Sequence, residues 1–169
     1  MLFVVSCGDS DDNGAEYLFV QTSDGAVLTG STLTLRGISP QTGWFSDRPY
    51  REAGQIRTEE FLAYWDEGED SFADDPPNAD LACTVDGEVV NYVVELQSPT
   101  LLVPYLREGC DSGACVLIYE IAVIGSETVA AGREIECDGA GHLFIDEALN
   151  CPAISNVIQI FEQCDGSYG

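Results

Sequence analysis

Two alternating apolar segments joined by a two-residue turn limit the fold of this chain more than any other feature. Every second residue from 79 to 85 and from 90 to 96 is apolar, which is the pattern of a strand with one buried face. Asp86 and Gly87 lie between them and form a pair that suits a tight antiparallel hairpin. We therefore expect a hairpin here, with the side chain of Cys83 pointing inward.

Four more segments have the composition of strands. In one of them Leu33 and Leu35 point to one side and their polar neighbours to the other, and in another Pro104 favours an edge position. Several short strands at close spacing, with little helix, are typical of an antiparallel β-sandwich, which is the fold we expect. These four segments are residues 17–22, 31–38, 101–106 and 115–124.

A single short helix is expected over residues 59–65. Thr58 can cap its start, and Glu59 and Glu60 fall in the first turn, where the helix dipole favours negative charge. Phe61 and Trp65 then share one face. Residues 39–49, ahead of this region, are rich in turn-forming residues and predict a loop.

The charge of the chain excludes two classes of partner. It has 30 acidic residues against 6 basic ones, all arginine, and a formal net charge of -24. Nucleic-acid binding needs clustered cations, and so does attraction to anionic lipid headgroups. We therefore expect no nucleic-acid partner, and no contact with a membrane except through a covalent lipid.

Cysteine usage favours disulfide bonds. Cys110 and Cys115 flank a turn, so we expect a bond between them, and the other four in the set should form two more bonds in one of three pairings. Zinc is disfavoured because the spacings contain no Cys-x2-Cys pair and only one histidine. An even set of six suits an oxidising compartment. The six are Cys83, Cys110, Cys115, Cys137, Cys151 and Cys164.

The first residues resemble a bacterial lipoprotein signal. An apolar run leads to Ser6 and Cys7, and an acidic polar stretch follows. In that family the cysteine becomes the lipidated first residue of the mature protein, which would make Cys7 the anchor. Only six residues precede Cys7, fewer than the ~15–30 of a signal peptide. The alternative is a frayed terminus with a chance cysteine.

Three regions follow from these features. Residues 1–16 are expected to be a signal remnant and an acidic tether. Residues 17–132 are expected to form the sandwich domain, and residues 133–169 a cysteine-containing extension tied to the same domain by disulfides. Strand and helix cannot be separated by periodicity in this last region.

Two short motifs add a resemblance. Residues 45–49 read Phe-Ser-Asp-Arg-Pro, and residues 76–79 read Pro-Pro-Asn-Ala. Together with the strand around Leu33 and the strand near Tyr119, they make residues 32–132 resemble an uncharacterised family of small exported bacterial domains. The resemblance implies export and a shared domain, and it brings no activity.

Catalysis has little support in the sequence. A nucleophilic triad would need His142, which lies in a glycine-rich stretch, and no Gly-x-Ser-x-Gly or Walker motif is present. Carboxylates are too abundant to single out a pair, so a secreted hydrolase acting through two carboxylates stays open as an alternative. We expect no catalytic residue and no cofactor.

Calcium is the second metal that the sequence makes worth considering, after zinc. Asp9, Asp11, Asn13 and Gly14 match the start of an EF-hand loop, but Val20 stands where the bidentate glutamate is required. An acidic stretch over residues 59–80 could hold divalent ions at ~millimolar affinity. The competing interpretation, which we favour, is a solubilising acidic surface, so no metal site is assigned.

The candidate binding residues gather in one segment. A recognition patch for an anionic or sugar ligand could form there, because aromatic rings and arginines lie close together. The structural alternative, which we favour, is a corner in which Phe45 is buried and Arg48 pairs with a carboxylate, while Asp47 accepts hydrogen bonds from its own loop. The candidate residues are Trp44, Asp47, Arg48, Tyr50 and Arg51.

Taken together, these features predict a non-enzymatic β-sandwich domain that is exported or lipid-anchored and binds a protein or a glycan. Its location would be periplasmic, anchored to the outer membrane, or extracellular.

Overall fold

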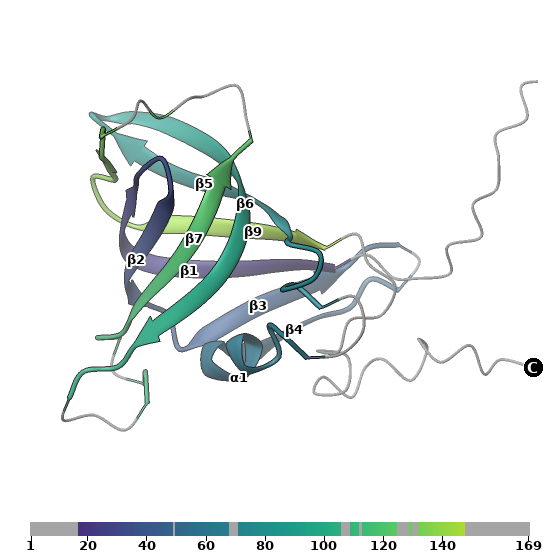
Figure 1. Cartoon of the computed structure of the whole chain (residues 1–169). Coiled ribbons are helices and arrows are strands. Elements are labelled where there is room, and N and C mark those ends of the chain that lie inside the picture. Colours follow the sequence, from purple (N-terminus) through teal and green to yellow (C-terminus); the bar gives the residue numbers. More distant parts are fainter. Residues whose placement is uncertain are drawn as a thin grey trace, which may run out of the picture.

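The structure is a computed structural model that describes residues 17–48, 50–67, 71–105, 109–111, 113–124, 129 and 132–147, without the side chain of Glu147. In these residues nine strands form one sheet, and a short helix lies against it (Figure 1). The elements are β1 (Tyr17–Leu28), β2 (Thr32–Ile38), β3 (Gln41–Ser46), β4 (Ala53–Arg57), α1 (Thr58–Ala63), β5 (Asn78–Val85), β6 (Glu88–Leu102), β7 (Val116–Val123), β8 (Ile135–Glu136) and β9 (Gly141–Glu147).

Six of the strands close into a barrel. Going round it, β1 pairs with β2, then come β7, β6, β5 and β9, and β9 pairs with β1 again. Every pairing is antiparallel. The mainly β fold with one short helix is confirmed, but the expected sandwich is wrong, because the sheet closes on itself instead of forming two packed layers.

β1 is the strand on which this closure depends. Its first half pairs with β3 along one edge and with β9 along the other, and its second half pairs with β2 and β8. The alternation in which odd-numbered residues are buried ends at Ser23, and beyond Gly25 the even-numbered Ala26 and Leu28 face inward together with the buried Val27. This change of face allows one strand to serve two parts of the barrel wall.

β6 turns a corner of the barrel. Its first part pairs with β5 and its second part with β7, and the register with β7 shifts between Leu96 and Pro99. Such a bulge bends a strand, and Figure 1 shows β6 curving round the barrel. The separate strand expected over residues 101–106 is therefore wrong, because Leu101 and Leu102 are the end of β6.

β3 and β4 extend the sheet beyond the barrel, next to the first half of β1 (Figure 1). β3 occupies residues that the sequence predicts as part of a loop. Its two buried residues are Thr42 and Trp44, so the inward face of this strand has only one apolar side chain. The loop prediction was wrong here because turn-forming residues surround and interrupt this short pattern.

The helix is present but shorter than expected, and its capping differs. Thr58 is the first helical residue rather than the cap, and no side chain caps the helix. Its hydroxyl donates to the carbonyl of Ser39 at 2.8 Å instead. Phe61 is fully buried, and Trp65 is buried just beyond the last turn. No helix in the described part of the chain has the length and apolar character needed to span a membrane.

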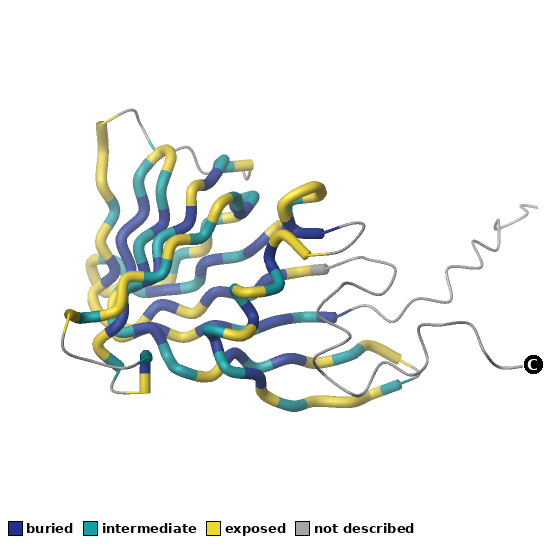
Figure 2. The backbone as a smooth tube through the Cα atoms, turned by 60° about the horizontal axis from the view of Figure 1, so that its bottom comes forward, coloured by how far each residue is buried: buried dark blue, intermediate teal, exposed yellow. Residues whose placement is uncertain are grey.

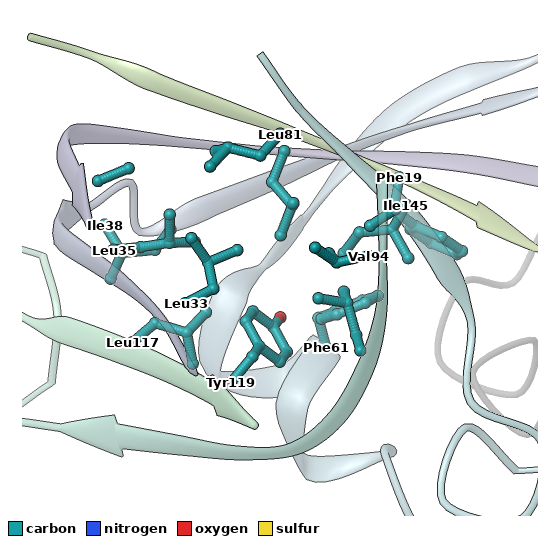
Figure 3. Close-up of a cluster of buried hydrophobic side chains, with 14 of the residues drawn as sticks. Phe19, Leu33, Leu35, Ile38, Phe61, Leu81, Val94, Leu117, Tyr119 and Ile145 are labelled. Carbon is teal, nitrogen blue, oxygen red and sulfur yellow. The ribbon is translucent and has the colours of Figure 1, made fainter. Parts of the chain in front are cut away.

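Burial alternates along the strands, as Figure 2 shows, and the inward residues form one core. The predicted hairpin is confirmed, with Asp86 and Gly87 at its turn and Cys83 buried. Leu33 and Leu35 both point inward as expected. They lie next to Tyr119 and Leu117 on the paired strand β7, and Figure 3 shows these side chains together in the barrel interior, with Phe61 entering from the helix.

A chain of buried hydrogen bonds crosses this apolar core. The Tyr119 hydroxyl donates to Gln21 Oε1 at 2.9 Å, and Gln21 Nε2 donates to Thr42 Oγ1 at 3.4 Å. Thr42 Oγ1 lies 2.9 Å from Thr58 Oγ1, and the Thr58 hydroxyl donates to the Ser39 carbonyl. Burial raises the pKa of Tyr119 above its ordinary value, although the hydrogen bond to Gln21 acts to lower it. The hydroxyl therefore stays protonated and can donate.

Two disulfides join parts of the fold. Cys110 and Cys115 are bonded as expected, between β6 and β7. Cys83 is bonded to Cys137, which settles one of the open pairings. Cys7, Cys151 and Cys164 lie outside the described residues, so the third bond stays a prediction.

The boundary expected at residue 132 falls inside the barrel. β9 lies between β5 and β1 and pairs with both, and β8 pairs with β1. Residues 135–147 are therefore part of the barrel wall and not an extension packed on it. The rest of that predicted extension, and the predicted tether over residues 1–16, lie outside the described residues.

We predict that Tyr119→Phe destabilises the protein by about 1–3 kcal/mol, because it leaves the buried Gln21 Oε1 without its donor. Chemical unfolding measures this loss. The matched control is Tyr105→Phe, whose ring is 99% exposed and whose loss of a hydroxyl should change stability by less than about 0.5 kcal/mol. Equal stability of the two variants would show that the buried hydrogen-bond chain contributes nothing.

Candidate functional site

The clearest candidate site is a groove on the outer face of the sheet. It has a volume of about 670 Å³ and is lined by residues of β1, β3, β5, β6 and β9. The strand alternation creates it: Phe19 and Ile145 point into the core, so their neighbours Leu18 and Phe144 point outward. The core and the groove therefore use opposite faces of the same strands.

Apolar side chains line most of the groove. Leu18 on β1 is opposite Phe45 on β3, and Phe144 on β9 is opposite Asp80 on β5, which is itself opposite Val93 on β6. Phe45 is 49% exposed and Val93 is 40% exposed, and what makes them informative is that they share one face with further apolar side chains. Registers across five neighbouring strands thus place four apolar side chains on one continuous face.

Three carboxylates accompany these apolar residues: Asp47, Asp80 and Asp146. Asp146 is opposite Leu18, so the acid sits beside an apolar side chain. Asp80 Oδ2 accepts a hydrogen bond from Asn91 at 2.7 Å. Asp80 Oδ1 is shielded from solvent and has no hydrogen-bond partner among the described residues. The Asp80 carboxylate is thus oriented by Asn91, and its Oδ1 atom can still accept a hydrogen bond.

No cation of the described chain lines this groove. The ion pairs of the described residues lie elsewhere: Arg36 binds Glu136 at 3.0 Å, and Arg57 binds Glu59 at 3.0 Å and Asp111 at 3.2 Å. The hydrogen bond to Glu59, followed by the charge of Asp111, raises the pKa of Arg57. Arg36 thus links β2 to β8, and Arg57 links the end of β4 to α1 and to Asp111.

The structure separates the candidate binding residues. Trp44 is buried, makes an edge contact with Tyr17 at 6.5 Å between ring centroids, and packs over Gly54. Tyr50 is half-buried against the core. Trp44 therefore belongs to the interior, whereas Tyr50 keeps part of its surface exposed.

The other three candidates lie at the surface. Asp47 lines the groove, and its carboxylate accepts a hydrogen bond from the Arg48 backbone N–H, as expected. Arg48 and Arg51 are exposed, and Arg51 has a positive φ of 53°. Among the described residues neither arginine has an ion-pair partner.

The expected corner at residues 45–49 is therefore wrong in its two main contacts. Phe45 is exposed rather than buried, and Arg48 pairs with no carboxylate in the described part of the chain. Trp44 takes the buried position instead. Because neighbours in a strand face opposite sides, burying Trp44 turns Phe45 outward into the groove.

Sequence reasoning missed most of the groove. Leu18, Phe144 and Val93 each lie in a run of consecutive apolar residues, where a half-buried strand would alternate with polar ones. That excess of apolar residues on the outer face was the available signal. Asp80 and Asp146 could not be singled out from the sequence, because the chain has 30 acidic residues.

The residues considered for catalysis and metal binding are not assembled into a centre. His142 is exposed on β9, opposite Thr22 and Ala82. Among the described residues, no group of three or more His, Cys, Asp or Glu side chains could hold a metal ion. The EF-hand-like residues from Asp9 to Gly14 lie outside the described residues.

Comparison with known proteins adds no assignment. No protein-family model matches the chain, and no curated protein or solved structure matches it either. The resemblance to exported bacterial domains therefore stays a prediction, and the function has to be argued from the groove.

We predict that Arg48→Ala leaves the melting temperature within error of wild type, since an exposed arginine without an ion pair contributes less than about 0.5 kcal/mol. Gly54→Ala, close by in the fold, is the contrasting variant. A Cβ at position 54 would lie 2.5 Å from the Trp44 ring, so it should lower the melting temperature clearly. A large loss for Arg48→Ala would restore the corner interpretation.

Proposed function

We propose that this chain is a non-enzymatic binding domain, exported or lipid-anchored, whose barrel presents the outer groove to a partner. The observation that carries the proposal is the exposure of Phe45 and Val93 on the same face as Leu18 and Phe144. The chain carries 30 acidic residues, and in this groove four apolar side chains lie together. Contiguous exposed apolar surface marks interaction sites in soluble proteins.

Export is supported by the disulfides. The bonds Cys83–Cys137 and Cys110–Cys115 are consistent with an oxidising compartment, where structural disulfides persist. The lipid anchor at Cys7 rests on the sequence pattern alone. A domain on a tether would hold its groove away from the membrane and open to soluble or surface-bound partners.

A carboxylate-dependent hydrolase is the second candidate, favoured by two of the three acids in the groove. Asp80 and Asp146 are diagonal neighbours on adjacent strands, a relation that places residues about 7–8 Å apart. Inverting glycosidases use carboxyl groups at a similar separation. We place this candidate second because one carboxylate is engaged by Asn91 and the groove is open, so it does not exclude water.

We predict that the groove binds Nile red, a neutral apolar dye, and that Phe45→Asp weakens binding about fivefold through loss of roughly 1 kcal/mol of apolar contact. Fluorescence titration measures the affinity. Val89→Asp is the matched control, because Val89 is also exposed, at 78%, but does not line the groove. Equal loss in both variants, or no dye binding by wild type, would count against the groove as a binding site.

A separate prediction concerns the anchor. When the protein is expressed in a bacterium behind a complete lipoprotein signal sequence that ends at Cys7, Cys7→Ser should move it from the membrane fraction to the soluble fraction and abolish incorporation of labelled palmitate. Ser10→Ala, in the same acidic stretch, should change neither. A membrane fraction unchanged by Cys7→Ser would exclude lipidation at this position.

A further inference from the structure

We infer that the groove accepts a cationic peptide segment of a partner protein, one that combines apolar side chains with lysine or arginine. The inference rests on the proposed function, because it names the occupant of the same site. It follows from charge complementarity: three carboxylates lie among apolar side chains, and no cation of the described chain neutralises them within the groove.

The positions of the acids favour this occupant. Asp146 is opposite Leu18 on one neighbouring strand and Asn78 on the other, and Asp80 is opposite Phe144 and Val93. Each of these two acids therefore has an apolar side chain directly beside it. None of the groove carboxylates takes part in the ion pairs of the described chain. An arriving cation would meet charges that are not already paired there.

Lysine and arginine match this arrangement in shape as well as in charge. Their aliphatic stems pack along apolar surface while the charged head reaches a polar group. A stem lying on Leu18 or Phe144 would bring its head to Asp146 or Asp80. Phe45 and Phe144 also offer ring faces to a guanidinium group. Asp80 Oδ1, shielded and without a partner in the described chain, would gain a donor if the groove adjusts to the ligand.

A neutral glycan uses fewer of these features. Its hydroxyl groups could bond to Asn78 and Ser46, and its rings could stack on the phenylalanines. The negative potential of three carboxylates would contribute little to a neutral ligand. The peptide is therefore the occupant that accounts for both the apolar and the charged lining.

The test uses the full-length protein and three probes in fluorescence titrations. The first is a short amidated peptide that alternates lysine with valine, the second replaces each lysine with threonine, and the third is maltopentaose. We expect the cationic peptide to bind at least about fivefold more tightly than the neutral one at low salt, with the difference shrinking as salt screens the charges. We expect no binding of the sugar.

Isosteric variants locate the charge. The double variant Asp80→Asn and Asp146→Asn should raise the Kd for the cationic peptide about twofold to twenty-five-fold, since each exposed ion pair is worth a factor of about 1.5 to 5. It should leave the Kd for the neutral peptide unchanged. The matched control, Asp86→Asn with Glu120→Gln, removes the same charge from exposed positions outside the groove and should have a much smaller effect.

The outcomes separate this inference from the proposed function. Equal binding of both peptides, weakened by Phe45→Asp, would keep the groove as a binding site and overturn its preference for cations. An equal effect of the two double variants would also overturn it, because attraction would then come from the net charge of the chain. Binding of maltopentaose alone would identify a glycan site. No binding of any probe, or of Nile red, would remove the groove as the site altogether.

Discussion

The pairing of β1 along both of its edges is the constraint on which the rest of this structure depends. β2 and β3 lie end to end along one edge, and β8 and β9 along the other. Because β1 pairs with β2 along one edge and with β9 along the other, six strands close into a barrel, and the β3–β4 pair extends the sheet beyond it. The change of buried face around Gly25 makes this double use possible. The core and the outer groove both follow from that one arrangement of strands.

The closed barrel is held by different interactions at different places. Pairing between β5 and β9 ends at Ala82 and His142, and the disulfide from Cys83 to Cys137 continues the connection just beyond it. Its sequence separation is 54 residues against 5 for Cys110–Cys115, so chain-entropy arguments assign it about 4 kcal/mol rather than about 2. Inside, the buried hydrogen bonds from Tyr119 onward specify which polar groups face one another.

The groove is a consequence of the barrel wall rather than of any motif. Its five strands come from distant parts of the sequence, and alternation places their outward residues together once the registers are set. Only Asp47 among the five candidate binding residues lies there. Phe45, expected to be buried, is exposed in it because Trp44 took the inward position. Such a site could not be recognised from spacing, since the strand neighbours were unknown.

The sequence by itself determined the local elements: the hairpin at Asp86 and Gly87, the inward face of β2, the short helix and the bond between the cysteines at 110 and 115. These depend on side-chain periodicity and turn chemistry, which act over a few residues. Only the tertiary structure decided that the sheet closes into a barrel, that β9 lies between β5 and β1, and that Cys83 pairs with Cys137. Those outcomes depend on which strand edges meet, and edges separated by many residues leave no periodic trace in the sequence.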